Sequence, residues 1–167
     1  MTHEPALRTR ASDKATREDH LRFLVQQFIR SFGLLASERT PCGMPLATSH
    51  AHALVVLLEH ARKGAQVTQQ QLGLALGIDK SNVTRLCAKM ERAGHLVQSR
   101  SPTDGRARVL ALTAKGQGLA ERAETSSRTR FAQLLAALPA RARVNVLDSL
   151  AALNGAVRAV RSAEASS

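Results

Sequence analysis

Two short helix-like segments joined by a tight glycine turn constrain the fold of this chain more than any other feature. They cover residues 67–78 and 82–93, and each has a capping residue near its start and a glycine near its end. These capping and terminating residues are Thr68 with Gly77 for the first segment, and Asp79 or Ser81 with Gly94 for the second. Two short helices in this arrangement predict a helix-turn-helix.

The residues behind this motif predict a β-hairpin. Residues 95–100 and 108–112 are two runs of extended character, and the segment between them contains a proline and an Asp-Gly pair, which favour a turn. A hairpin directly after a helix-turn-helix forms the wing of a winged-helix fold. We expect the winged helix to extend over about residues 48–113.

Two more helices are expected next to these elements. Thr48 or Ser49 can cap a helix that reaches Leu58 or beyond, and Thr113 can cap a longer helix that runs to about Leu138. The predicted fold class is therefore mainly α with a small β-hairpin wing. It is a winged helix-turn-helix with further helices at both ends of the chain.

Apolar residues that recur at steps of three and four predict the first and last helices. One covers residues 20–36, and the other follows Pro139, which suits the first turn of a helix. Their apolar faces consist of Leu21, Leu24, Phe28, Phe32 and Leu35 in the first helix, and of Val144, Leu147, Leu150, Ala151, Asn154 and Val157 in the last. Because one small domain does not need both faces for its own core, we expect N- and C-terminal dimerisation helices.

The chain is expected to form a single domain with short polar ends. Residues 1–18 are polar, mixed in charge and without apolar periodicity, which predicts a flexible N-terminal arm. The predicted parts are this arm at 1–18, the domain at 19–162 with dimerisation helices at about 20–36 and 113–161, and a frayed tail at 163–167.

The charge and composition of the chain favour duplex DNA as its partner. A formal net charge of +11 attracts polyanions or an anionic membrane surface. The longest apolar run, residues 53–58, is too short to span a bilayer, so no membrane partner is expected. The absence of Trp and Tyr disfavours single-strand binding, which relies on aromatic stacking. With only Cys42 and Cys87, no disulfide framework is implied, and the cytoplasm is the expected compartment.

From Thr68 to Gly116 the sequence resembles the MarR family of winged-helix regulators. The matching residues are the run 82–86, Glu91 with Gly94, the run 104–106, Leu112 with Thr113, and Gly116. The order of the surrounding helices fits too, so the resemblance covers most of residues 20–160. It implies a homodimer that represses, and in some relatives activates, nearby genes. It also implies a small aromatic or phenolic effector in a crevice between the dimer helices and the DNA-binding part.

The second short helix is expected to enter the major groove of DNA. At 100° per residue, Val83, Leu86, Cys87 and Met90 lie on one side of it, and Ser81, Thr84, Arg85 and Ala88 on the other. Arginine can donate two hydrogen bonds to guanine, and small hydroxyls can reach several base edges. A merely solvated polar face is the alternative.

The hairpin adds positive charge to this predicted DNA-binding surface. Between Asp79 and Lys115 the chain has eight basic and three acidic residues, a net charge of +5. Arg106 resembles a wing-tip arginine that enters the minor groove, and Asp104 is expected to orient neighbouring arginines or to cap the turn. The predicted DNA-binding residues are Thr68, Gln69, Lys80, Ser81, Asn82, Thr84, Arg85, Lys89, Arg100, Arg106 and Arg108.

Cys42 leaves a redox- or metal-sensing regulator open as an alternative. It lies in a Pro/Gly loop near Arg39, which could lower its pKa, although a spectator thiol is the favoured interpretation. The spacing of His50, His52 and His60 does not bring them together on one helix, but a site that combines Cys42 with one of these or with His20 stays open. We therefore predict no metal and no cofactor, and we expect Cys87 to act as a small core residue.

Catalytic motifs are missing from the sequence. It contains no phosphate-binding GxxxxGK[ST], no nucleophile elbow and no HExxH. We therefore expect a regulator that binds a palindromic operator and is not an enzyme. A non-specific architectural DNA-binding protein is the other alternative, because it would have the same charge.

Overall fold

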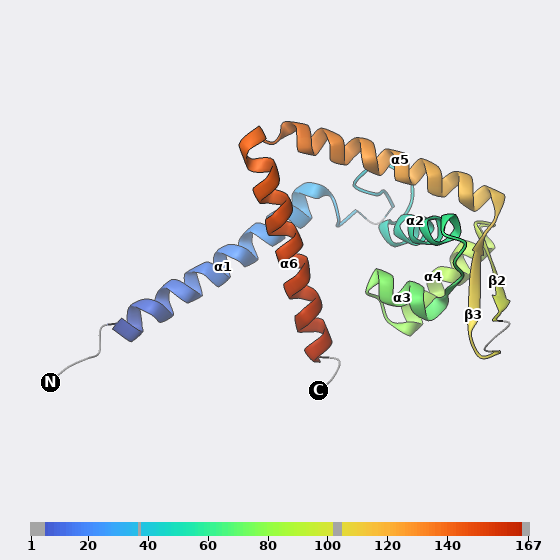
Figure 1. The fold of residues 1–167 in the computed structure, drawn as a ribbon, viewed down its shortest axis with the longest axis horizontal. Helices are drawn as coiled ribbons and strands as arrows, with labels where there is room; N and C mark the ends of the chain where they lie inside the picture. The colour runs from blue at the N-terminus through green and yellow to red at the C-terminus, as the bar shows by residue number, and fades with distance from the viewer. Residues whose placement is uncertain (1–5, 37, 102–104, 165–167) are drawn as a thin grey trace. The chain divides into compact units, whose positions relative to one another are not determined.

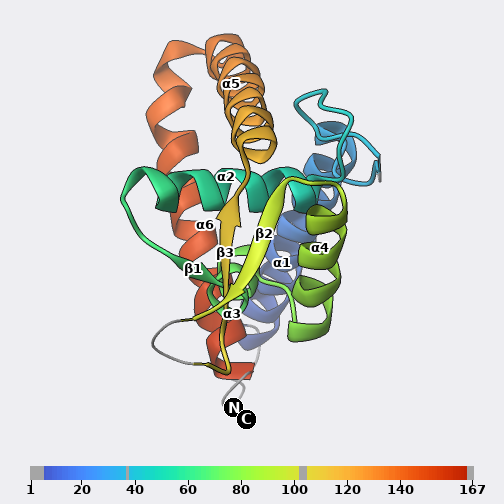
Figure 2. The same cartoon turned by 90° about the vertical axis from the view of Figure 1, so that its right-hand side faces the viewer.

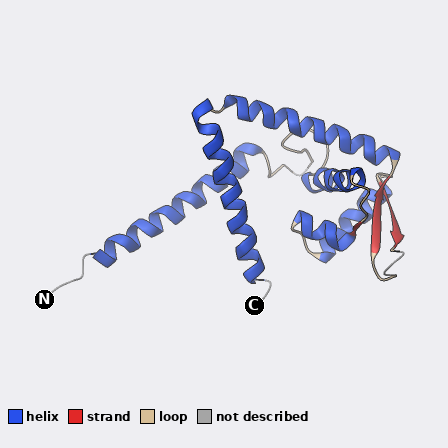
Figure 3. Ribbon diagram, in the orientation of Figure 1, coloured by secondary structure: helices blue, strands red, loops and turns tan. Residues whose placement is uncertain are grey.

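The computed structural model describes residues 6–36, 38–101 and 105–164 (Figure 1). The elements in chain order are α1 (Ala6–Phe32), α2 (Thr48–Arg62), β1 (Val67–Thr68), α3 (Gln69–Leu76), α4 (Lys80–Arg92), β2 (Leu96–Arg100), β3 (Arg108–Leu112), α5 (Ala114–Ala137), the 3-10 turn η1 (Ala140–Ala142) and α6 (Arg143–Glu164). Figure 3 shows that helices dominate and that the strands belong to one small region. The predicted fold class is confirmed. The chain forms two compact units, Met1–Ser126 and Ser127–Ser167.

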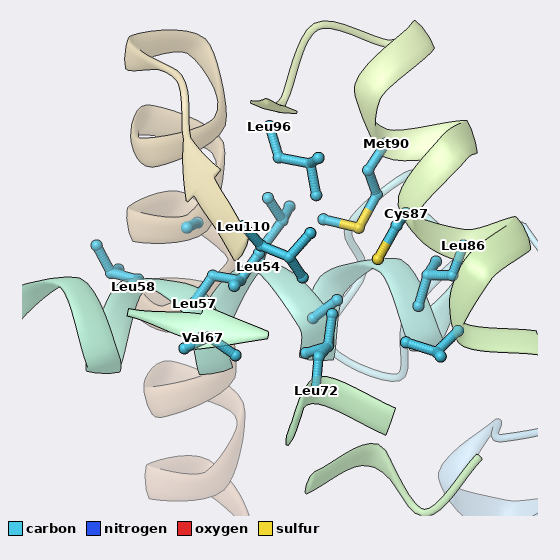
Figure 4. Packing of buried hydrophobic residues seen from close by; sticks show 13 residues of the cluster. Leu54, Leu57, Leu58, Val67, Leu72, Leu86, Cys87, Met90, Leu96 and Leu110 are labelled. Atoms are coloured by element: carbon cyan, nitrogen blue, oxygen red, sulfur yellow. The ribbon is translucent and has the colours of Figure 1, made fainter. Parts of the chain in front are cut away.

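The core of the first unit lies between α2, α3, α4 and the sheet. Figure 4 shows side chains from all four of these parts pointing into one interior, among them Leu54, Leu72, Met90, Leu96 and Leu110. The first four of these are almost completely buried. Burying a side chain of this size stabilises a fold by about 1.5–3 kcal/mol, so this cluster holds the helix-turn-helix and the wing together.

Three antiparallel strands form the sheet, in the order β1-β3-β2 (Figure 2). In the hairpin, Leu96 pairs with Leu112 at one end and Arg100 pairs with Arg108 at the other. Strand β1 pairs with the edge of β3 that faces away from β2, and Val67 lies opposite Leu110 there. The sequence did not predict β1, because two residues are too few to produce an alternating pattern.

The predicted caps of α3 and α4 are confirmed. Thr68 and Gln71 form a capping box at the start of α3, and the Asp79 carboxylate accepts a hydrogen bond from the Asn82 backbone at the start of α4. Gly77 and Gly94 end the two helices with φ angles of 66° and 70°, which residues with a Cβ rarely adopt. These local signals explain why the sequence located both helices correctly.

Two predictions about the first helices are wrong. The helix predicted from residue 20 begins at Ala6, because residues 6–18 contain good helix formers and neither Pro nor Gly. Residues 6–18 are therefore helical, although the sequence predicted them as part of an arm. Neither Thr48 nor Ser49 caps α2: the N-cap position is Ala47, without a side-chain hydrogen bond, and both residues are already helical.

The second unit consists of the end of α5, the turn η1 and α6. Pro139 is the N-cap of η1, as its fixed φ allows, and α6 follows directly. The Arg143 side chain donates hydrogen bonds of 3.3 Å to the backbone carbonyls of Leu138 and Ala136, which have no partner further along the helix. Arg143, the first residue of α6, therefore stabilises the turn at η1.

Candidate nucleic-acid interface

Helix α4 has the two-sided character that the sequence predicted. Its apolar residues Val83, Leu86, Cys87 and Met90 are buried in the core. The residues of this helix that were predicted to contact DNA are exposed, and these are Lys80, Ser81, Asn82, Thr84, Arg85 and Lys89. The helix can therefore present a continuous polar surface to a partner without disturbing the core.

Several side chains on this surface are already hydrogen-bonded to one another. The Asn82 amide donates to the Asp79 carboxylate, and its oxygen accepts from the Arg85 guanidinium at 2.6 Å. The Thr84 hydroxyl donates to the Lys80 carbonyl at 2.8 Å. The hydrogen bond from the Asn82 backbone nitrogen, and then those from the Asn82 amide and the Ser81 backbone, lower the pKa of Asp79 and keep it ionised.

A concavity of about 700 Å³ lies between α3, the start of α4 and the wing. It brings together five of the predicted DNA-binding residues: Thr68, Gln69, Lys80, Arg106 and Arg108. The last three are basic, whereas Leu74, Ile78 and Val83 supply apolar surface between them. The charged side chains among the described residues that line the concavity are all basic, and such a group favours an anion.

The wing carries its positive charge in an arrangement that an anion would stabilise. Arg100 and Arg108 are directly opposite each other in the register of β2 and β3, and both are exposed. Like charges at such positions repel. Arg106, beside Gly105, is also exposed, whereas Asp104 and its predicted role lie outside the described residues.

A hydrogen-bond network that the sequence did not predict joins the wing to the helix-turn-helix. Glu91 of α4 accepts hydrogen bonds from the Gln98 backbone at 3.0 Å and from the Gln98 amide at 2.8 Å. Gln98 in turn accepts from the Gln69 amide of α3. Gln69 was predicted to bind DNA, and here its amide also helps to hold β2 against both helices. Its partner is distant in sequence, so no local pattern could reveal this contact.

A buried histidine pair is the second feature that the sequence missed. The His50 Nε2 atom of α2 lies 3.0 Å from the His95 Nδ1 atom, just before β2. Burial, the neighbouring His95 and then Lys89 lower the pKa of His50 to about 4. Burial and Lys115 lower the pKa of His95. Both imidazoles are therefore neutral at neutral pH, and one donates to the other across the hydrogen bond.

The structure gives no support to a metal site at Cys42. In the described parts of the chain, no three or more His, Cys, Asp or Glu side chains are grouped as a metal ion requires. Cys42 is half-buried, and its carbonyl accepts a hydrogen bond from the Ser126 hydroxyl at 2.7 Å. Cys87 is buried; burial, with Glu91 nearby, raises the pKa of its thiol to about 11, so it acts as a core residue as predicted.

No helix within the described ranges combines the length and the apolar character that crossing a membrane requires.

This arrangement of three helices, a capped turn and a hairpin defines a winged helix-turn-helix protein. Residues 43–107 match the model of the MarR family. This part of the chain is therefore similar to that family, as the resemblance of its sequence indicated. The match includes α2, α3, α4 and β2, and thus the polar surface of α4 and most of the concavity. No curated protein matches the sequence.

Solved structures, two of them described as transcriptional regulators, share the fold. A probable transcriptional regulator from Pseudomonas aeruginosa is 24% identical, with 81% of this chain and 98% of that chain covered and a TM-score of 0.66. The PcaV regulator from Streptomyces coelicolor, in complex with its natural ligand, is 23% identical, with 86% and 95% covered and a TM-score of 0.63. MepR from S. aureus, in complex with DNA, is 18% identical, with 94% and 99% covered and a TM-score of 0.61. At these identities the likeness establishes the fold.

Proposed function

We propose that this chain is a sequence-specific, double-stranded DNA-binding transcription regulator. The observation that carries the proposal is the exposed polar side of α4, with Arg85 at its centre, above a core that holds its other side. In this mode of binding α4 is the recognition helix in the major groove, where Arg85 bonds to a guanine edge. The wing carries Arg106 into the adjacent minor groove. The regulator acts in the cytoplasm.

The concavity supports this mode of binding. A DNA strand that passes between a recognition helix and a wing has its phosphates there, and Lys80 and Arg108 line that space. The net charge of +11 would attract the duplex over a longer range. MepR, which shares the fold, is bound to DNA in its solved complex, and this is consistent with the same use of the fold here.

We further propose that the regulator is a homodimer held by α1 and α6. Each helix leaves large apolar side chains exposed, for example Phe28 at 52% in α1 and Leu147 at 55% in α6. Contiguous exposed apolar surface of this kind marks an interaction site. A two-fold dimer would bind a palindromic operator with half-sites about one helical turn, roughly 34–36 Å, apart.

We also propose that the protein represses transcription and that a small aromatic or phenolic effector relieves this repression. The PcaV structure contains that protein's natural ligand, and the PefR structure from Streptococcus agalactiae contains heme. Both support ligand control on this fold.

Selection of genomic DNA fragments by the full-length protein tests the proposal. We expect enrichment of fragments with an inverted repeat, and a footprint on both half-sites. Competition by random duplex should be weaker than competition by the selected fragment by about 10³-fold or more. Equal competition would indicate an architectural protein, and a footprint on one half-site would contradict the palindrome.

A further inference from the structure

We infer that Asn82 acts as a positioning residue that holds Arg85 for DNA recognition, and that it does not itself read a base. This inference rests on the proposed function, because it concerns how the same surface recognises DNA. It changes the role that the sequence assigned to Asn82, which was a direct contact.

The geometry points to Asn82 as the middle of a relay of three side chains. Asp79, Asn82 and Arg85 follow one another at intervals of three residues, so they lie along one side of α4. Asp79 holds the Asn82 backbone nitrogen at 2.8 Å with one carboxylate oxygen and the Asn82 amide with the other. The Asn82 oxygen accepts from the Arg85 guanidinium at 2.6 Å.

Both polar ends of the Asn82 side chain are engaged in this relay. An asparagine that recognises adenine uses its amide and its oxygen together, in a bidentate contact. Here the amide donates to Asp79 and the oxygen accepts from Arg85. Asn82 would have to give up both bonds to read a base in that way, whereas Arg85 keeps further N–H donors for a guanine.

The relay has a physical benefit for recognition. A free arginine side chain samples many rotamers, and binding a base edge must select one of them. An acceptor three residues earlier restricts the guanidinium before DNA arrives. The order of the relay also matches its charges, since the amide lies between the Asp79 carboxylate and the Arg85 cation and is polarised by both.

A double-mutant cycle on the full-length protein tests the inference. The probe is the duplex that the protein selects from the genomic pool, together with its single-base variants. Asn82→Ala should weaken binding about 3- to 10-fold and flatten the preference at the same base pair as Arg85→Ala. In the Arg85→Ala background, Asn82→Ala should cause almost no further loss. Circular dichroism and thermal unfolding show whether each variant is folded.

Two variants separate positioning from other effects. Asp79→Ser keeps an oxygen that can cap α4 but removes the second oxygen that holds the Asn82 amide, so it should flatten the same base pair to a smaller extent. Arg92→Ala is the control: it removes an exposed side chain of the same helix that was not predicted to bind DNA and that donates to the Ala88 carbonyl at 3.3 Å, so it should leave that base pair unchanged.

The outcomes distinguish this inference from the proposed function. Independent, additive losses for Asn82→Ala and Arg85→Ala, or a flattened preference at a different base pair, would show that Asn82 contacts DNA itself. The proposed DNA recognition by α4 would then be retained, but the positioning role of Asn82 would be wrong. If the protein selects no duplex over random DNA, or if Arg85→Ala changes no base preference, the proposed recognition by α4 fails and the relay fails with it.

Discussion

The winged helix, from α2 to β3, and the terminal helices α1 and α6 differ in where their large apolar side chains lie. In the winged helix, Leu54, Leu72 and Met90 are buried by residues of the same chain. In the terminal helices, Phe28, Leu147 and their neighbours remain about half exposed. The winged helix therefore supplies its own core, whereas the terminal helices have apolar surface that a partner can cover.

This difference separates two kinds of consequence for a substitution. A change in the buried core of the winged helix should alter the free energy of unfolding whatever the protein concentration. A change on the exposed faces of α1 or α6 should alter association, and its effect should depend on concentration. The predictions below test this separation, beginning with the largest expected effect.

Gly116→Ala should be the most damaging single substitution of those considered. A Cβ at this position would lie 1.7 Å from the His95 carbonyl oxygen, which is backbone and cannot rotate away. We expect a loss of more than about 4 kcal/mol in the free energy of unfolding, or no folded protein. Gly118→Ala in the same helix is the control, because its Cβ would make only an ordinary contact at 3.8 Å. Urea unfolding should show Gly118→Ala unchanged or up to about 1 kcal/mol more stable. Equal effects of the two would contradict the close packing of α5 on the wing.

Leu72→Ala and Leu147→Ala test the comparison directly. Leu72 is fully buried, so its truncation should cost about 2–5 kcal/mol of unfolding free energy at any protein concentration. Leu147 is 55% exposed, so its truncation should barely affect the folded subunit but should raise the dimer dissociation constant about 10-fold or more. Sedimentation over a range of concentrations measures the second effect. A Leu147→Ala protein with unchanged association would exclude α6 from the interface.

The buried histidine pair should make the winged helix sensitive to acid. The pKa of His50 is lowered from 6.5 to about 4, so its contribution to stability is complete above about pH 6.5 and is lost as the pH falls towards 4. Between pH 7 and pH 5 this amounts to a loss of about 2 kcal/mol. His50→Gln should remove most of this pH dependence, whereas His52→Gln, at an exposed position of the same helix, should keep it. Unfolding curves at several pH values that showed the same slope for both variants would rule out His50 as the source.

Features fixed by neighbours in sequence were predictable, and those fixed by distant contacts were not. Thr68, Asp79 and Gly94 cap or end helices through bonds within a few residues, so they could be recognised directly. The hairpin of β2 and β3 was recognised in the same way, from two short extended runs around a turn. By contrast, the pairs His50 with His95 and Gln69 with Gln98 are joined only by the folded chain.

The candidate site was predictable as a set of residue types but not as a geometry. The sequence placed Arg85 on the outward side of α4 and included Asn82 among the predicted DNA-binding residues. It could not show that Asn82 is bonded to both Asp79 and Arg85, since an amide at that spacing can equally well point to solvent. The start of α1 was missed for a different reason: propensity alone extends a helix beyond the apolar pattern used to find it.

The smallest expected effects concern the two arginines that we assign to different grooves of the same DNA. Arg85→Ala should cost about 1–3 kcal/mol on the selected operator and flatten preference at one base pair per half-site, because a bidentate base contact is lost. Arg106→Ala should weaken binding most on A·T-rich flanks and reduce the salt dependence of affinity, because a cation near the phosphates is removed. Binding titrations on single-base operator variants at several salt concentrations measure both.

These two phenotypes also complete the comparison, because both substitutions lie on exposed parts of the winged helix. Neither should change the free energy of unfolding or the dimer dissociation constant, since neither side chain contributes to the core or to the apolar faces of α1 and α6. Lys63→Ala is a matched control: it removes one exposed cation outside the concavity, where Lys63 pairs with Glu59 at 2.7 Å. If Lys63→Ala reduced the salt dependence as much as Arg106→Ala does, the effect would reflect net charge alone. The proposal that Arg106 enters the minor groove would then be wrong. Separately, if Arg85→Ala left the base preference unchanged, Arg85 would be excluded as the major-groove contact.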